Sequence, residues 1–407
     1  MTIGAAVSPL LRTMRDLDCR WQRARRPDRR SVLFDARTAM EYGMMAPVLR
    51  RLRDDSRVRT ALISSTHPER AREIFREAPP DVPVLSPRAA MMQRFDACVA
   101  ANLVWATLPR RAPRVQMFHG VSGKFSREYD RPDTSMRQWD RLFFINRRRL
   151  QNYVASGAID RDSPAIRLVG MPKSDCLVDG SITRAAVLEA NGIDPAATTV
   201  LYAPTWTQFS SLNAMGEALV AGLVDAGYCV LVKLHDLSLD PAVVNSGGVD
   251  WIARLTPILA KGNGHIIRSA DASPWLVASD VLITDHSSIG FEYLLLDRPL
   301  IRIAMPELIA RADIGTEYVE LMRAVSTTVE NAAAAIAAVG RALADPGDLA
   351  KARRALALEL FHDPGRATEH ASRELYELME LEPAAWLKPA VHAPAMVGAP
   401  ERALSRS

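Results

Sequence analysis

The hydrophobic pattern of this 407-residue chain alternates, from residue 31 onward, between short apolar runs and longer amphipathic stretches. The amphipathic stretches 46–55 and 68–78 have the spacing of helices. In the first half of the chain, runs typical of strands occur at 31–36, 59–65, 82–86, 96–101, 114–120, 141–146 and 166–170. Strands that are separated by helices indicate a parallel sheet with crossover helices.

The alternation breaks near 175–184 and then restarts in the second half of the chain. Strands are predicted there at 198–204, 229–235, 265–269, 281–285 and 299–304, and helices at 214–227, 273–280 and 291–296. The predicted fold class is therefore α/β, with two units in tandem. Such an arrangement places a cleft between the units at the carboxyl ends of both sheets, where ligand sites of α/β proteins collect.

Both ends of the chain differ from this pattern. Residues 11–30 are rich in arginine and have apolar positions at helical spacing, which fits either a surface helix with a solvated linker or a basic element on anionic lipid. Helices are expected over 328–344 and 348–382, and the Pro- and Ala-rich end is expected to be disordered. The predicted divisions are 1–30, 31–178, 179–345, 346–382 and 383–407.

Composition narrows the class of protein. The apolar share of 48%, the charged share of 24% and the formal net charge of +4 are typical of a soluble globular protein and do not indicate nucleic-acid binding. Apolar runs stay short of the roughly 18 residues that span a bilayer. The four cysteines are far apart, which favours a cytoplasmic setting without a zinc site or disulfide framework.

Five polar residues in a row, 284–288, interrupt the apolar pattern where a predicted strand meets a helix. Capping would need only one of them, whereas a helix start with extra hydroxyl groups suits a phosphate or diphosphate. The candidate diphosphate ligands here are Thr284, Asp285, Ser287 and Ser288. Glu292, one turn into the helix, is a candidate contact for a sugar hydroxyl or a solvated position.

Three further strand ends carry polar residues that suit chemistry in the cleft. A histidine at such a position is the natural general base near neutral pH, and a lysine can neutralise phosphate. The residues are His119, Gly120 and Lys124 after the run 114–120, Thr205 and Trp206 after 198–204, and Lys233 and His235 at the end of 229–235. Each position alone has a structural explanation, but together they predict one polar site in the cleft.

Five motifs then resemble, in order and spacing, those of the CDP-glycerol glycerophosphotransferases, which build teichoic-acid-like poly(glycerol phosphate). The motifs are HG with a nearby lysine (119–124), VGMPKSD (169–175), LYAPTW (201–206), KLHD (233–236) and LITDHSSIGFEYLLLDRPLI (282–301). The family usually has tyrosine where His286 stands and aspartate where Glu292 stands. The resemblance covers roughly residues 96–345 and implies a GT-B fold, with two Rossmann-like domains and C-terminal helices that return to the first.

The resemblance also implies an activity and roles for residues. The enzyme would transfer glycerol phosphate, or a similar polyol phosphate, from a CDP-activated donor to an acceptor hydroxyl and release CMP. His119 matches the general base of the family, His235 matches the histidine that contacts the pyrophosphate, and the hydroxyl groups near 284–288 hold the donor phosphates. The motifs require neither metal nor cofactor. A lipid-linked or glycan acceptor, used in a teichoic-acid-like or capsular polymer, would place the enzyme at the cytoplasmic face of an anionic membrane.

Two alternatives stay open on the sequence. A UDP-sugar glycosyltransferase or epimerase of GT-B fold would use the same cleft. A non-catalytic scaffold for envelope assembly would keep the fold with a degenerate cleft, which the intact polar cluster disfavours.

Overall fold

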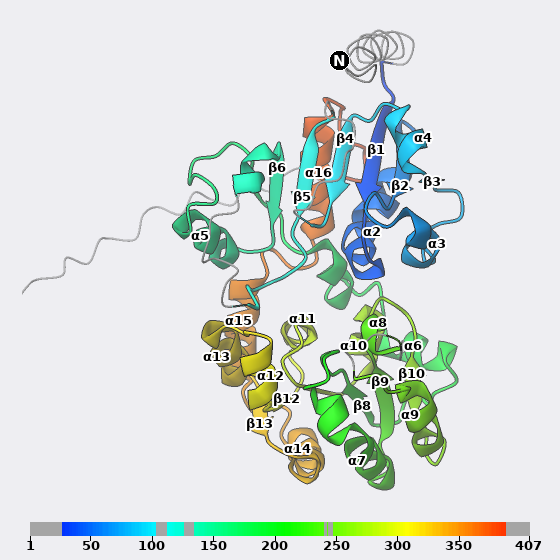
Figure 1. Ribbon diagram of the computed structural model, residues 1–407, viewed down its shortest axis with the longest axis vertical. Helices are drawn as coiled ribbons and strands as arrows, with labels where there is room; N and C mark the ends of the chain where they lie inside the picture. The colour runs from blue at the N-terminus through cyan, green and yellow to red at the C-terminus, as the bar shows by residue number, and fades with distance from the viewer. Residues whose placement is uncertain (1–26, 103–111, 126–133, 240–241, 243–246, 388–407) are drawn as a thin grey trace, which may run out of the picture.

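The computed structural model describes residues 27–102, 112–125, 134–239, 242 and 247–387, which form two stacked α/β units (Figure 1). Each unit contains one sheet whose strands are all parallel. The predicted fold class is confirmed. Of the terminal segments that we singled out, residues 1–26 and 388–407 lie outside the described residues.

The first unit has a seven-stranded sheet in the order β3-β2-β1-β4-β5-β6-β7. Its strands are β1 (Arg30–Asp35), β2 (Val58–Ile63), β3 (Val84–Leu85), β4 (Ala97–Ala100), β5 (Arg114–Met117), β6 (Arg141–Phe144) and β7 (Ile166–Leu168). Its helices are α2 (Ala39–Arg53), α3 (Ala71–Ile74), α4 (Pro87–Met91) and α5 (Arg147–Ala155), with 3-10 helices η1 (Pro68–Arg70) and η3 (Thr134–Gln138). The central strand β4 is buried at every position, because helices cover both faces of a parallel sheet.

The second unit has a six-stranded sheet in the order β10-β9-β8-β11-β12-β13. Its strands are β8 (Thr199–Tyr202), β9 (Cys229–Lys233), β10 (His265–Ile267), β11 (Val281–Thr284), β12 (Leu300–Ile303) and β13 (Thr327–Val329). Its helices are α6 (Arg184–Ala190), α7 (Ser211–Asp225), α8 (Asp236–Leu239), α9 (Trp251–Leu259), α10 (Ser273–Ala278), α11 (Ile289–Tyr293), α12 (Pro306–Arg311), α13 (Thr316–Ala324) and α14 (Ala332–Ala344), with η6 (Leu294–Leu296).

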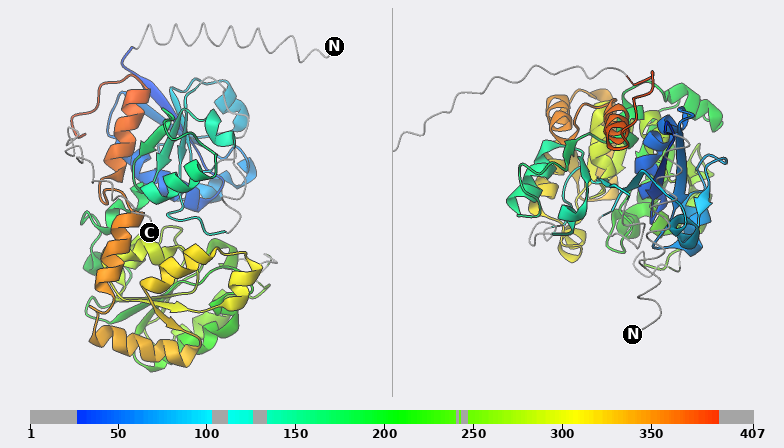
Figure 2. Two further views of the ribbon diagram at one scale, coloured as in Figure 1. Left: turned by 90° about the vertical axis from the view of Figure 1, so that its left-hand side faces the viewer. Right: turned by 90° about the horizontal axis from the view of Figure 1, so that it is seen from above.

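Two C-terminal helices join the units. Helix α15 (Ala350–Leu360) contacts η6 of the second unit and α5 of the first, and α16 (Ala367–Leu378) packs against α2 and against η4 (Pro172–Leu177) (Figure 2). The return of the C-terminal helices to the first unit is thus confirmed. Helices were expected over 328–344 and 348–382. In the structure β13 occupies 327–329 ahead of α14, and a turn at 361–366 separates α15 from α16.

The chain crosses between the units at two places that contact each other. The carboxylate of Asp175 accepts hydrogen bonds from the backbone N–H groups of Ala367 (3.0 Å) and Thr368 (2.7 Å). Gly170 has a φ of +93°, and a Cβ there would lie 2.5 Å from the carbonyl oxygen of His362. Only glycine accepts this conformation without strain at such close approach, so the two crossings are held together.

The first residues of the predicted tail are described and packed. The ring of Trp386 lies 6.3 Å from that of Tyr376 between centroids, and the Arg51 guanidinium lies 4.5 Å from the Trp386 centroid. Among the helices of the described ranges, none has the length and apolarity needed to cross a membrane.

Candidate active site

The segment that follows β5 reaches from the first unit to the second. Phe125, at its end, forms an antiparallel bridge with Ile314, and the Gly315 N–H donates to the Lys124 carbonyl at 2.9 Å. The predicted residues His119, Gly120 and Lys124 all lie on this segment. The site therefore spans both units.

His119 is held in one orientation by the backbone. Its Nδ1 lies 2.5 Å from the carbonyl oxygen of Ala101, so Nδ1 carries the proton and Nε2 keeps a lone pair. Asn102, which follows Ala101 in the chain, donates a hydrogen bond to the buried carboxylate of Glu41 at 3.1 Å. Glu41 also accepts hydrogen bonds from Arg37. This network fixes the carbonyl that orients the imidazole. A lone pair at Nε2 is what a general base needs.

Charge and burial around His119 favour its neutral form. Burial lowers the pKa of His119, the hydrogen bond to Ala101 opposes this, and the Arg149 guanidinium lowers the pKa further. Arg149 also donates to the Gly120 carbonyl at 2.9 Å and to the Tyr153 hydroxyl at 3.0 Å. Arg149 thus anchors the backbone beside the histidine. Nothing in the sequence pattern singled out Arg149, Glu41 or Asn102.

The four candidate phosphate ligands near 284–288 divide into two kinds. Thr284 has no exposed surface, and its hydroxyl donates to the Ala203 carbonyl at 2.6 Å. Ser287 is half-buried and Ser288 is exposed. Because Thr284 is enclosed and bonded within the protein, its placement does not support the direct phosphate contact expected from the sequence, whereas the two serines stay accessible.

Asp285 is likewise enclosed and organises the neighbouring loop. One carboxylate oxygen accepts from the N–H groups of Thr205 (2.9 Å) and His286 (2.7 Å), and the other accepts from the N–H (3.1 Å) and the hydroxyl (3.0 Å) of Ser211. An anion in this position would repel a phosphate rather than bind it. We therefore assign Asp285 a positioning role for the loop 203–211, in place of the direct contact first expected.

Lys233 and His235 end the apolar run of β9. Lys233 is buried, and burial lowers its pKa, although Asp236 acts in the opposite direction. His235 accepts a hydrogen bond from the Leu237 N–H at Nδ1 (3.1 Å), so its Nε2 carries the proton. His235 is exposed, but the protein around it and the nearby Lys233 lower its pKa, against the effect of Asp236. His235 is therefore a neutral N–H donor, whereas His119 is a neutral acceptor.

Glu292, a candidate contact for a sugar hydroxyl or a solvated position, has a partner within the protein. Its carboxylate pairs with Lys173 Nζ at 3.0 and 3.3 Å, and both side chains are largely buried. Burial lowers the pKa of Lys173, but Glu292 and Asp271 outweigh this and raise it overall. Lys173 lies 119 residues from Glu292 in the chain. The VGMPKSD motif, which contains Lys173, was the only feature of the sequence that pointed to this residue.

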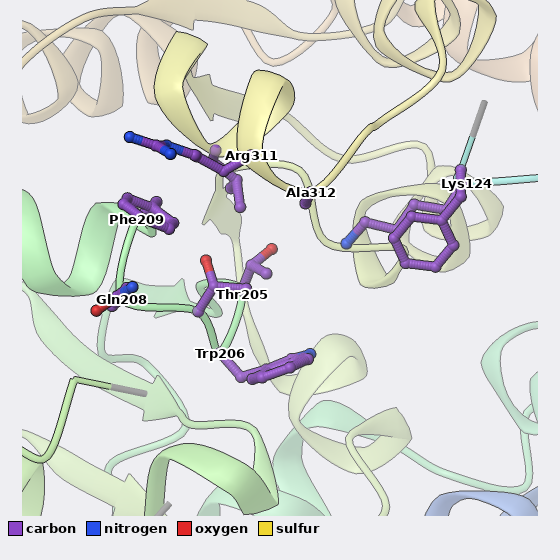
Figure 3. A pocket seen from close by; sticks show the side chains of 10 residues that line it. Lys124, Thr205, Trp206, Gln208, Phe209, Arg311 and Ala312 are labelled. Atoms are coloured by element: carbon purple, nitrogen blue, oxygen red, sulfur yellow. The ribbon is translucent and has the colours of Figure 1, made fainter. Parts of the chain in front are cut away.

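A pocket of about 290 Å³ brings part of the site together between the units (Figure 3). Three of the residues that line it were predicted, namely Lys124, Thr205 and Trp206. The other lining residues were not predicted: Phe125, Thr207, Gln208, Phe209, Leu308, Arg311 and Ala312. The rings of Trp206 and His235 lie 6.0 Å apart. Over the described ranges, no group of three or more His, Cys, Asp or Glu side chains has the geometry of a metal site.

Comparison with known protein families identifies the family of this chain. Residues 110–370, well over half of its length, match the family described as CDP-glycerol:poly(glycerophosphate) glycerophosphotransferase. The chain belongs to this family. The matched range includes every predicted site residue, from His119 to Glu292.

Individual relatives agree with the family. The teichoic acid poly(glycerol phosphate) polymerase of Staphylococcus epidermidis is 25% identical over 200 residues, which are 46% of this chain and 25% of that protein. The alignment thus spans about a quarter of this curated relative. A variant of the wall teichoic acid polymerase TagF soaked with CDPG superposes with a TM-score of 0.65 at 15% identity, over 86% of this chain and 89% of that one.

A UDP-GlcNAc 2-epimerase from Neisseria meningitidis, bound to UDP-GlcNAc, superposes with a TM-score of 0.53 at 14% identity. The overlap covers 85% of this chain and all of that one (100%). At these identities the solved structures show the fold alone, and the fold they share with this chain is the predicted GT-B arrangement.

Proposed function

We propose that the protein transfers glycerol phosphate, or a similar polyol phosphate, from a CDP-activated donor to an acceptor hydroxyl. The observation that carries the proposal is the family match over 110–370, which includes a histidine whose lone pair is oriented by the fold. The relative from S. epidermidis is a poly(glycerol phosphate) polymerase, and a TagF structure was obtained with CDPG. The product would be a teichoic-acid-like or capsular polymer.

In the proposed reaction, Nε2 of His119 removes the proton from the acceptor hydroxyl as its oxygen attacks the glycerol-bearing phosphorus. A new P–O bond forms, the bond between that phosphorus and the bridging oxygen of the diphosphate breaks, and CMP leaves with the electron pair. Ser287, Ser288, the Nε2–H of His235 and Lys233 would hold the diphosphate. Preorganised donors of this kind stabilise the charge that develops on the leaving group.

A donor screen tests this function. The purified full chain is incubated with CDP-glycerol, CDP-ribitol and UDP-GlcNAc, and release of CMP or UMP is measured together with thermal stability. We expect CMP release with a CDP-polyol, and a rise in Tm with nucleotides that bind, because a ligand of the folded state stabilises it. Release of UMP from UDP-GlcNAc with no reaction of the CDP-polyols would contradict the proposal.

The same screen includes the double variant Ser287→Ala with Ser288→Ala. If these hydroxyls hold the diphosphate, KM for the CDP-polyol rises about 100-fold or more, since two hydrogen bonds to a charged group are lost and each is worth roughly 1.5–3 kcal/mol. Ser181→Ala, at an exposed loop position of the linker, is the matched control. An unchanged KM in the double variant would remove the two serines from the donor site.

We further propose that the acceptor is lipid-linked or a glycan, and that the enzyme works at the cytoplasmic face of the membrane. The support is the polymer named for the relative from S. epidermidis together with the Arg-rich residues 11–30, of which 11–26 lie outside the described residues. Deleting 11–26, which leaves Arg30 of β1 and its hydrogen bonds in place, is expected to lower co-sedimentation with vesicles that contain anionic lipid and to leave co-sedimentation with neutral vesicles unchanged. Equal sedimentation of both proteins with anionic vesicles would refute this proposal.

A further inference from the structure

Asn146, at the start of α5, is a buried amide whose hydrogen bonds reach three segments of the chain. The residue is only 1% exposed. Its Oδ1 accepts a hydrogen bond from the Arg149 N–H at 2.8 Å and so caps the helix. Its Nδ2 donates to the carbonyl oxygen of Val121 at 2.7 Å and to that of Leu360 at 2.8 Å. The amide therefore joins the segment that carries His119 to the end of α15.

The three contacts of Asn146 require one acceptor and two donors on a single short side chain. A backbone N–H can only donate and a carbonyl can only accept, so the orientation of the amide is fixed. An ionised aspartate supplies acceptors alone, and a serine has a single O–H proton. Either residue would cap the helix about as well as asparagine does. What asparagine adds to the cap is therefore the pair of donated hydrogen bonds.

The backbone directly after His119 is held by the first turn of α5 at two successive carbonyl groups. Arg149 donates to the carbonyl of Gly120 at 2.9 Å, and a Cβ on Gly120 would lie 2.9 Å from the same guanidinium. Asn146 donates to the next carbonyl, that of Val121. The place of the imidazole of His119 thus depends on α5 as well as on the hydrogen bond that orients the ring.

The same amide contacts the place where the chain returns to the first unit. Leu360 is the last residue of α15, the helix that contacts η6 of the second unit and α5 of the first (Figure 1). Two residues later, the N–H of His362 donates to the carbonyl of Ile145 at 3.1 Å. The C-terminal crossing is therefore docked on Ile145 and Asn146, whose side chain also holds the segment of the proposed base.

We propose that Asn146 is a positioning residue that sets the place of His119 according to how the C-terminal crossing is docked. A shift of α15 between the units is transmitted through this amide to the segment 119–125. The inference rests on the proposed function and deepens it, because it makes the base responsive to the arrangement of the two units. Placement matters for the rate, since an error of about 1 Å can lower it about 10²-fold.

Asn146→Ser tests the proposal, because the hydroxyl can still cap α5 but cannot donate to both carbonyls. We expect kcat for CMP release to fall about 10- to 100-fold. KM for the CDP-polyol should stay within about twofold of the wild-type value, because the residues proposed to hold the diphosphate lie on the second unit. Steady-state kinetics of the full-length protein measure both, and thermal unfolding shows that each variant is folded.

Asn331→Ser is the matched control for this substitution. Asn331 is exposed and caps α14 in the same way, by accepting from the Ala334 N–H at 2.9 Å. Its kcat should equal that of the wild type. Asn146→Asp is a second test variant, which keeps a capping oxygen and cannot donate when it is ionised, so it should show the same loss as Asn146→Ser.

A double-mutant cycle with His119→Ala separates positioning of the base from general damage to the fold. If Asn146 acts through His119, adding Asn146→Ser to His119→Ala lowers kcat no further, within about twofold. An equal fall in both backgrounds would assign Asn146 a structural role only and overturn the proposal. An unchanged kcat for Asn146→Ser in the wild-type background would overturn it as well.

Hydrogen–deuterium exchange of the full-length protein tests the connection without any activity. In Asn146→Ser, peptides that contain 119–125 and peptides that contain 360–366 should both exchange faster, whereas peptides from α14 should not change. Unchanged exchange in either region contradicts the connection even when CDP-glycerol is turned over. If both regions exchange faster but no CDP-polyol reacts, the connection stands and the proposed function fails.

Discussion

Replacing His119 by alanine is expected to lower kcat for CMP release about 10²–10⁴-fold, the usual contribution of a well-placed general base. The donor would still bind, because the serines, His235 and Lys233 are untouched, so KM for the CDP-polyol should change little. Steady-state kinetics of the purified variant check this. His265→Ala, on the edge strand β10, is the matched control. Wild-type turnover in His119→Ala would exclude this residue as the base.

The pH dependence of the reaction gives a second readout of the same residue. Burial lowers the pKa of His119 below the ordinary histidine value of about 6.5. A base with a lowered pKa stays deprotonated, and therefore active, as the pH falls through 6.5. In a plot of kcat/KM against pH, the fall on the acid side should accordingly lie below about pH 6.5. This fall should be absent in His119→Ala. An acid limb above that value would contradict the environment described for the imidazole.

Replacing Asp285 by alanine is expected to destabilise the protein by about 3 kcal/mol or more. The carboxylate accepts four hydrogen bonds, from Thr205, His286 and twice from Ser211, and it has no exposed surface. Removing it leaves several buried donors without a partner, and each unsatisfied group costs about 1–3 kcal/mol. The loop 203–211 then loses its anchor, so donor binding should weaken as well. Urea denaturation followed by circular dichroism measures the change.

Asp162→Ala is the comparison for this experiment, since Asp162 is exposed and a surface change usually shifts stability by less than about 0.5 kcal/mol. If Asp285→Ala were as stable as Asp162→Ala, the four hydrogen bonds could not be the anchor of the loop.

Much of the architecture could be predicted from the sequence because the chain forms two parallel sheets. Such strands are buried on both faces, so they appear as near-continuous apolar runs, and β4, β8 and β11 lie within runs that were predicted. Short polar helices such as α5, with three arginines in nine residues, have no comparable signal. Strand β13 was assigned to the following Ala-rich helix because it is only three residues long.

The sequence by itself also determined where chemistry could occur, since polar residues that follow parallel strands meet at one edge of each sheet. Only the tertiary structure decided which of these residues face the ligand space. Asp285 and Ser287 are two positions apart, yet one is enclosed as an anchor and the other stays accessible. Likewise, the pairing of Glu292 with Lys173 and the pocket that both Arg311 and Lys124 line bring together segments far apart in the chain. The physical reason is that side-chain direction in a loop depends on the hydrogen bonds the loop makes, and no local pattern encodes partners that folding brings from another unit.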